Sequence, residues 1–265
     1  MTFSSTEELE AILALPDPFH LFRLLAGSDH MHFGYFLAED ETIHEAQENM
    51  MRLNLMFLRR ADRRVLDAGS GLGATSRVLA YRGLAVTAVC PDPALVAYSK
   101  RARIASRTGS VEWVCARLEQ YRPSAPFDLI LFQESFQYFD HVEETLRGAY
   151  QGLRAGGRLV VGDQFLNEAL PRADARFHYI EHFLSAARAV GFRLHTHCDI
   201  STGAARSIDW MLQLLEREGP GLIAQYGKRL PGLARNVEDM RRLSAMERKG
   251  FAEGRLSYRI LALDR

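Results

Sequence analysis

The sequence predicts an α/β protein built on a doubly wound, mostly parallel sheet. From Arg63 onward, short β-branched or apolar runs alternate with helical stretches, which is the pattern of strand–helix–strand units. Gly83 and the Gly156–Gly157 pair stand where helix C-caps are expected. Because strand–helix–strand crossovers are right-handed, these units predict a single sheet whose strands run largely in one direction.

The regular part of this pattern comprises five strands and three helices. The predicted strands are Val65–Asp67, Ala85–Val89, Val111–Cys115, Phe127–Phe132 and Arg158–Gly162. The helices between them are Ala74–Tyr81, Pro93–Ser106 and Val142–Leu153. A further helix over Ala175–Val190 leads to a strand at Phe192–Asp199, residues 201–255 are helical, and the last strand is Leu256–Leu263.

The residues before Arg63 are predicted to form a helical N-terminal cap. Ser5-x-x-Glu8 and Thr42-x-x-Glu45 have the spacing of capping boxes, in which two side chains satisfy the first free N–H groups of a helix. The first helix is expected to end near Pro16 and the second near Arg60. The chain is therefore one domain, divided into a cap (1–62), a core (63–200), a helical lid (201–255) and a last strand (256–265).

Composition excludes several classes of protein. The 265 residues carry a formal net charge of zero, which gives no electrostatic reason to expect a nucleic-acid or membrane partner. Three lysines, none in a Gly-Lys-Ser/Thr context, exclude a P-loop. Three separated cysteines predict neither a disulfide framework nor a zinc knuckle, and no leader-like or membrane-spanning segment is visible. A soluble, cytoplasmic protein, monomeric or homodimeric, is the expectation.

The run from Val65 to Gly73 is the most informative segment. It reads as a buried strand that ends at Asp67, followed by three alternating glycines that open a helix. Glycine brings bare backbone up to a ligand, and ligands of such sheets lie outside the carboxyl ends of the strands. The spacing alone does not exclude a dinucleotide, since Ala74 can fill the third small position. A carboxylate at Asp67 favours a cationic ligand with an amino group over a pyrophosphate.

Through Asp67, Gly69, Gly71 and Gly73 the chain resembles the class I S-adenosylmethionine-dependent methyltransferases, in their small-molecule and natural-product branch. The similarity extends from about Phe33 to Asp199. It implies a Rossmann-like, seven-stranded, mostly parallel sheet with an antiparallel last strand and an insertion that covers the substrate. It also implies S-adenosylmethionine as cofactor, with Asp67 and the glycines around its methionine part. By the same resemblance, Gln133, Tyr35 and Gln47 belong to the walls of the site.

The positions that read the nucleoside depart from the family pattern. Cys90 stands where an acid usually binds the ribose, and Asp92 is the nearest substitute, although Asp92-Pro93 also reads as a helix N-cap. Arg117 stands near the usual adenine-binding Asp, so that it either stacks on adenine or is a solvated loop residue. A further alternative to stacking is that recognition of the adenine falls to the backbone of Leu118.

The fourth strand runs from apolar residues into Gln133 and Glu134, where a catalytic group is expected. Glu134 either faces the acceptor or contacts nearby backbone, and His141 and His178 are the other candidates for a general base. His178 and His182, four apart on the predicted helix, show no third ligand, so no metal site is expected.

The sequence thus predicts methyl transfer to an O or C atom of a small acceptor. The aromatic residues Tyr35, Phe136, Tyr138 and Phe165 favour an apolar or aromatic acceptor, or are plain core residues. Two alternatives stay open at this stage. One is a repurposed fold (a cyclase, isomerase or decarboxylase) whose cofactor is structural or lost, and the other is a non-catalytic partner subunit.

Overall fold

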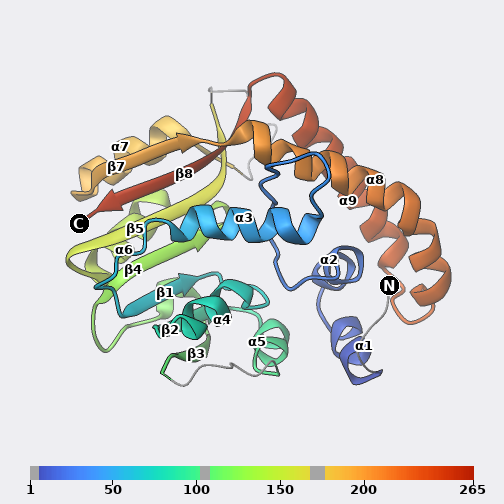
Figure 1. The fold of residues 1–265 in the computed structure, drawn as a ribbon, viewed down its shortest axis with the longest axis horizontal. Coiled ribbons are helices and arrows are strands. Elements are labelled where there is room, and N and C mark those ends of the chain that lie inside the picture. The colour runs from blue at the N-terminus through green and yellow to red at the C-terminus, as the bar shows by residue number, and fades with distance from the viewer. Residues whose placement is uncertain (1–5, 102–107, 168–176) are drawn as a thin grey trace.

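A computed structural model describes residues 6–101, 108–167 and 177–265, in which a twisted sheet is flanked by helices (Figure 1). The strand order is β3-β2-β1-β4-β5-β8-β7, and a two-residue strand, β6, pairs with β5 beside this path. Only β8 runs antiparallel to its neighbours β5 and β7 among the described pairings. The strands are β1 (Arg64–Ala68), β2 (Ala85–Cys90), β3 (Ser110–Cys115), β4 (Phe127–Gln133), β5 (Leu153–Leu166), β6 (His178–Tyr179), β7 (Arg193–Asp199) and β8 (Leu256–Asp264).

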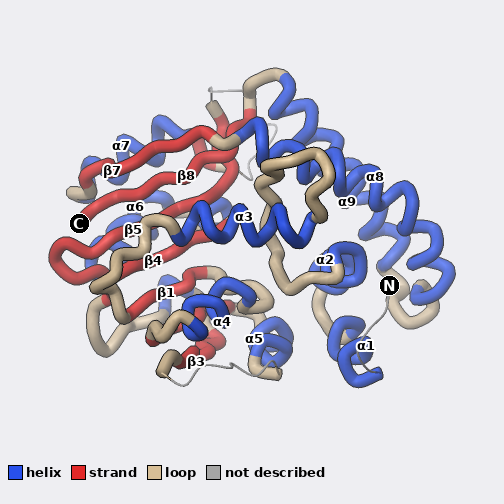
Figure 2. The backbone as a smooth tube through the Cα atoms, viewed as in Figure 1, coloured by secondary structure: helices blue, strands red, loops and turns tan. Residues whose placement is uncertain are grey.

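The helices form a layer on each face of the sheet, with α3 in front and α6 behind in the tube view (Figure 2). Apolar residues of α3 and α4 pack on one face, and those of α6 and α7 pack on the other. The long helices α8 and α9 lie beside α1 and α2 and share a separate apolar core with them. The helices are α1 (Thr6–Leu13), α2 (Phe19–Ala26), α3 (Ile43–Leu55), α4 (Ala74–Tyr81), α5 (Pro93–Ser99), α6 (Val142–Gly152), α7 (Ile180–Val190), α8 (Ser201–Tyr226) and α9 (Leu233–Ala252).

The predicted α/β fold and its antiparallel end are therefore confirmed, and the differences lie at the boundaries of elements. The capping box at Thr42 and Glu45 is present, but α3 ends at Leu55 and not near Arg60. The described part of α5 ends at Ser99, and residues 102–106 of the longer predicted helix lie outside the described residues. Ser5 of the first predicted capping box also lies outside them.

The prediction of a single helix over Ala175–Val190 is wrong for its first part. His178 and Tyr179 form β6, paired with Phe165 and Leu166 of β5, and α7 begins only at Ile180. Residues 175 and 176 lie outside the described residues. Strand β6 is the eighth strand of the sheet. Because His178 lies in β6 and His182 lies in α7, these two residues do not share a helix face.

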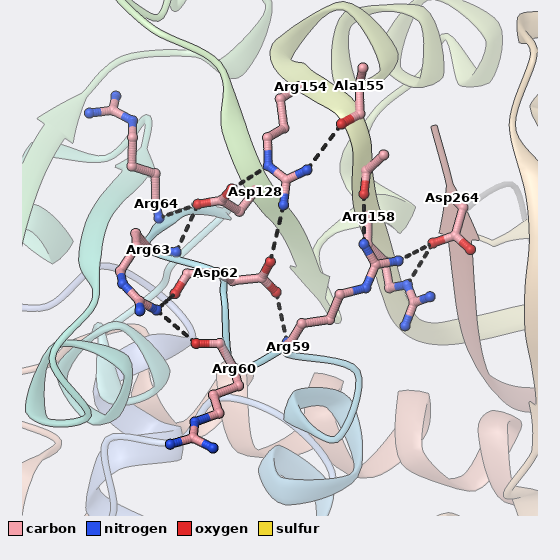
Figure 3. Close-up of polar contacts among 11 residues, drawn as sticks. Arg59, Arg60, Asp62, Arg63, Arg64, Asp128, Arg154, Ala155, Arg158 and Asp264 are labelled. Carbon is pink, nitrogen blue, oxygen red and sulfur yellow. Dashed lines mark hydrogen bonds and ion pairs between the residues drawn. The ribbon is translucent and has the colours of Figure 1, made fainter.

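The end of the sheet opposite the glycine turn is held by a cluster of arginines and aspartates (Figure 3). Asp128 Oδ2 accepts hydrogen bonds from the backbone N–H groups of Arg63 and Arg64, at 2.7 and 2.8 Å. Its Oδ1 accepts from Arg154 Nε at 2.5 Å. One carboxylate therefore joins the start of β1 to β4 and to the turn in β5.

We expect Asp128→Ala to lower the free energy of unfolding by about 1–3 kcal/mol, because two backbone N–H groups lose their acceptor. Urea unfolding followed by circular dichroism measures the change. Asp128→Asn is the matched control, since its amide oxygen still accepts from the backbone. An equal loss in both variants would contradict the assignment and point to the Arg154 ion pair instead.

In the part of the chain that the structure describes, no helix is long and apolar enough to cross a membrane.

Candidate active site

Two adjoining cavities open at the carboxyl ends of β1, β2 and β4. The glycine-loop cavity, of about 470 Å³, lies over the turn after β1. The lid cavity, of about 350 Å³, is lined by residues of α2, of the segment before α3, and of the helices α8 and α9. Met31, His32, Glu134 and Tyr138 are among the residues that line both. A molecule in one cavity therefore lies next to a molecule in the other.

The glycine turn is fixed by its backbone conformation and by close neighbours. Gly69, Gly71 and Gly73 have φ of 81°, 54° and 76°, a region that L side chains rarely adopt. A Cβ on Gly69 would stand 2.5 Å from Ser135 Cβ, and one on Gly73 would stand 2.3 Å from the Trp113 ring. Gly69 and Gly71 line the glycine-loop cavity, whereas Gly73 is the N-cap residue of α4 and does not line it. Two of the three glycines of the turn thus bring their backbone to the wall of this cavity.

Asp67, at the end of β1, lines the same cavity and is 3% exposed. Its Oδ2 accepts a hydrogen bond of 2.5 Å from Ser76 Oγ. Burial raises the pKa of Asp67 to about 6, and the Ser76 hydrogen bond opposes that rise. A buried carboxylate in this state favours a ligand that brings a positive charge to it.

The nucleoside-reading positions named from the sequence all lie on the wall of the glycine-loop cavity: Cys90, Asp92, Arg117 and Leu118. Asp92 Oδ1 caps α5 by accepting from the N–H groups of Ala94 and Leu95, so the N-cap interpretation is confirmed. Arg117 is exposed and pairs with Glu119, which lines the cavity as well. No role is assigned to Glu119 from the sequence, although this residue follows Arg117 by two positions.

We expect Cys90→Asp to tighten the binding of S-adenosylhomocysteine about tenfold, because a carboxylate at the end of β2 accepts from ribose hydroxyls. Titration calorimetry of both proteins measures it. Cys115→Asp is the matched control, since Cys115 pairs with Cys90 in register on β3 but does not line the cavity. Equal or weaker binding by Cys90→Asp would contradict the placement of the ribose at Cys90.

Gln133, the last residue of β4, presents an unused donor to the glycine-loop cavity. Its Oε1 accepts a hydrogen bond of 2.8 Å from Thr75 Oγ1. Its buried Nε2 has no partner among the described residues. Since buried polar groups are rarely left unpaired, this amide is placed to donate to a ligand.

Glu134 follows directly and has a left-handed backbone, with φ of 49°. Its N–H donates to the Gly162 carbonyl at 2.8 Å, and its Oε1 accepts from Phe33 N–H at 2.7 Å and from Tyr258 Oη at 2.9 Å. A non-glycine residue in this region stores strain, which is common at functional sites. The carboxylate is thus held in the wall that the two cavities share.

Burial raises the pKa of Glu134 well above its ordinary value, and the Asp163 carboxylate adds to the rise against the hydrogen bonds from Phe33 and Tyr258. Asp163 is itself buried, and its pKa is raised to about 7. A carboxyl group with a raised pKa is a stronger base than an ordinary carboxylate, and such a group beside a cavity is a candidate general base.

Residues 29–33, in the segment before α3, contribute to the lining of both cavities and are called the roof segment here. Gln47 Nε2 donates to the carbonyls of His30 and His32, at 3.0 Å each. His32 Nδ1 lies 2.8 Å from the Phe33 carbonyl and His30 Nδ1 lies 3.1 Å from His32 Nε2, which fixes both rings as neutral donors at Nδ1. Burial lowers the pKa of His30 to about 3 and that of His32 to about 4. Gln47 lines the lid cavity, whereas Tyr35 packs against Gly203 and lines neither cavity.

Asp29 ties this roof to the glycine turn. Its carboxylate accepts from Arg23 Nε at 2.9 Å and from an Arg77 nitrogen at 2.5 Å, and Arg77 also donates to the Leu72 carbonyl at 2.8 Å. The signal for this tie in the sequence is the run from Asp29 to His32, in which three of four side chains are titratable.

The other two predicted bases lie outside both cavities. His141 is exposed at the start of α6, and His178 on β6 stacks edge-on against Phe136, with ring centroids 5.6 Å apart. His182 pairs with Glu143 at 2.8 Å. Among the described residues, no group of three or more His, Cys, Asp or Glu side chains is arranged to hold a metal ion.

Comparison with known proteins finds similarity to methyltransferases. Residues 66–161 match a family model described as a methyltransferase domain. The demethylmenaquinone methyltransferase of Tropheryma whipplei (strain Twist) is 31% identical over 101 residues, which are 38% of this chain and 41% of that protein. The 27-O-demethylrifamycin SV methyltransferase of Amycolatopsis mediterranei is 32% identical over 142 residues, or 52% of each chain. This chain thus spans about half or less of the length of these two curated relatives.

Among solved structures, one titled as the [4+2]-cyclase SpnF superimposes with a TM-score of 0.74. It is 21% identical, and the match covers 97% of this chain and 93% of that one. A likeness at this level of identity shows a shared fold.

Proposed function

Because the chain belongs to the class I S-adenosylmethionine-dependent methyltransferase family, we propose that it transfers a methyl group from S-adenosylmethionine to an O or C atom of a small, largely apolar acceptor. The observation that carries the proposal is the position of Glu134, in the wall common to the two cavities. A base at this point lies between a methyl donor on one side and an acceptor on the other.

The residues of the glycine-loop cavity fit the family's cofactor. Backbone at Gly69 and Gly71 leaves room for it, Asp67 suits its amino group, and the unpartnered Nε2 of Gln133 offers a donor. Cys90 and Arg117 are the two departures, and a lost charge-assisted hydrogen bond weakens binding by about 10–100-fold without abolishing it. When bound, the cofactor supplies an electrophilic sulfonium methyl group.

The chain's own residues then have three tasks. The hydrogen bonds from Phe33 N–H and Tyr258 Oη hold Oε1 of Glu134, so that Oε2 is the oxygen free to accept the proton of an acceptor hydroxyl. The helices α8 and α9 and the roof segment enclose the acceptor and exclude water. The common wall sets the approach of acceptor to methyl, which is the main requirement of an in-line displacement.

The test is incubation of the purified protein with S-adenosylmethionine and a panel of small phenols, alcohols and alkenes, followed by mass spectrometry. Methyl transfer predicts one S-adenosylhomocysteine for each methylated product. A repurposed fold would give a changed acceptor without cofactor consumption, and a partner subunit would give neither. Calorimetric titration with S-adenosylmethionine separates a missing acceptor from a missing cofactor site.

A further inference from the structure

The lid cavity presents hydrogen-bond acceptors and carboxylates to its occupant and, among the described residues, neither lysine nor arginine. We propose that the acceptor of this protein carries a protonated amine on an apolar body, and that the cavity recognises the ammonium group. The proposal rests on the proposed function, since it names the class of acceptor for the same site.

Two buried amide oxygens line this cavity without a partner. Gln47 is 2% exposed and Gln164 is 4% exposed, and in each the Oε1 atom has no hydrogen bond among the described residues. The orientation of the Gln47 amide is fixed, because its Nε2 already donates to two backbone carbonyls. Leaving a buried hydrogen-bond acceptor without a partner costs free energy, so these two oxygens favour a ligand that donates hydrogen bonds to them.

These acceptors belong to one continuous wall. Gln164 on β5 lies opposite Tyr258 on β8, and the hydroxyl of Tyr258 contacts Glu134 Oε1. On the other side, Gln47 holds the roof segment whose Phe33 N–H contacts the same Oε1. The two unpartnered oxygens therefore belong to side chains next to the groups that hold Glu134, and all three side chains line the same cavity.

The charges around the cavity favour a cation. Glu247 on α9 lies close enough to raise the pKa of Glu134, and Asp17 and Asp239 also line the cavity. Asp17 contacts His20, and Asp239 contacts arginines of its own helix. His32 is neutral at pH 7 because its pKa is lowered to about 4. Four carboxyl side chains, those of Asp17, Glu134, Asp239 and Glu247, thus line a cavity whose described lining has no lysine or arginine, and such a lining favours a cation.

The remainder of the lining suits an apolar body. A cavity of about 350 Å³ holds a small organic molecule. Among its polar groups, the amide nitrogen of Asn236 is a donor without a partner among the described residues. This nitrogen and the Asp17 carboxylate both lie beside Gly232. The apolar lining includes Phe22, Ile208, Trp210, Met211, Met240 and Leu243.

The ammonium group is a recognition group and not the methylated atom, because a protonated nitrogen has no lone pair to attack the methyl. Its charge has a second effect beside Glu134. An opposite charge nearby favours the ionised carboxylate, so a bound cation lowers the pKa of Glu134 and favours its base form. Recognition of the acceptor and activation of the base are then coupled.

The test is calorimetric titration of the full chain, saturated with S-adenosylhomocysteine, with three probes of similar shape: phenylbutylamine, phenylbutanol and phenylpentanoate. We expect the amine to bind at least about tenfold more tightly than the alcohol, and we expect the carboxylate to bind most weakly of the three. Glu247→Gln and Gln164→Leu should each weaken the amine about tenfold relative to the alcohol. Glu238→Gln, an exposed position of α9 outside the cavity, is the matched control.

Equal affinity for amine and alcohol, tighter binding of the carboxylate, or an unchanged amine affinity in both variants would overturn the proposal. Affinity for S-adenosylhomocysteine and the melting temperature show whether each variant is folded. If the natural protein does not bind S-adenosylhomocysteine, the proposed function fails, and the same three titrations without it still decide whether the cavity selects a cation.

Discussion

Glu134→Gln is expected to lower kcat by about 10²–10⁴-fold on an acceptor identified by the panel, with little change in the Kd of S-adenosylhomocysteine. The substitution keeps an oxygen for the hydrogen bonds from Phe33 N–H and Tyr258 Oη, so the wall between the cavities should stay in place. Only the ability to accept a proton is lost. Steady-state kinetics and calorimetry on the same preparation separate the two effects.

The control is His141→Gln, which alters the competing candidate base. His141 is exposed and lines neither cavity, so its variant should retain full activity. If Glu134→Gln kept its activity, the carboxylate would be a structural acceptor for the roof segment and not the base. If it lost cofactor binding as well, the fall in kcat would report a disturbed wall.

The pH dependence of the reaction supplies an independent readout. Glu134 acts as a base only when ionised, so the rate should rise with pH through its pKa, which burial and Asp163 hold well above 4.5. Tyr258→Phe removes a hydrogen bond that favours the ionised carboxylate, and the midpoint of the profile should therefore move to higher pH. A flat profile, or a shift to lower pH in Tyr258→Phe, would exclude this role.

Local patterns predicted most of the fold because each strand and helix of the core is encoded over a few residues. Alternating apolar runs and the Thr42 capping box act within a single element, and both are observed. The His178–Tyr179 strand was missed because it depends on pairing with Phe165 and Leu166, which are distant in sequence. A helical pattern near this segment gave no sign of that partner.

The residues of the candidate site also fall into two groups, those that a local sequence pattern marks and those that only tertiary contacts bring to the site. Asp67, Gly69, Cys90 and Glu134 stand at or just after strand ends, where the sequence pattern places site residues, and they line the cavities. Other contributors are brought in by tertiary contacts: Gln164 through the register of β5 with β8, and His30 and His32 through the roof segment held by Gln47. No pattern within one element marks such residues, because their neighbours come from elsewhere in the chain.

Asp67→Asn is expected to weaken S-adenosylhomocysteine about 10–100-fold at pH 7.5, because the proposed partner of the ligand's ammonium group loses its charge. The natural protein should show the same weakening by acidification. The pKa of free Asp67 is raised to about 6, and a bound cation lowers it, so binding is strongest above pH 6. Below that pH, each further unit should cost about a factor of ten until the bound form also protonates.

Titration calorimetry between pH 5 and 8 measures this dependence, and methylthioadenosine is the matched ligand because it has the nucleoside without the ammonium group. Its affinity should be insensitive to Asp67→Asn. Ser76→Ala removes the hydrogen bond that lowers the pKa of Asp67, so the onset of weakening should move to higher pH. Equal losses for both ligands would mean that Asp67 shapes the glycine turn. A loss confined to S-adenosylhomocysteine would mean that Asp67 reads charge, because the two ligands meet the same turn and differ at the ammonium group.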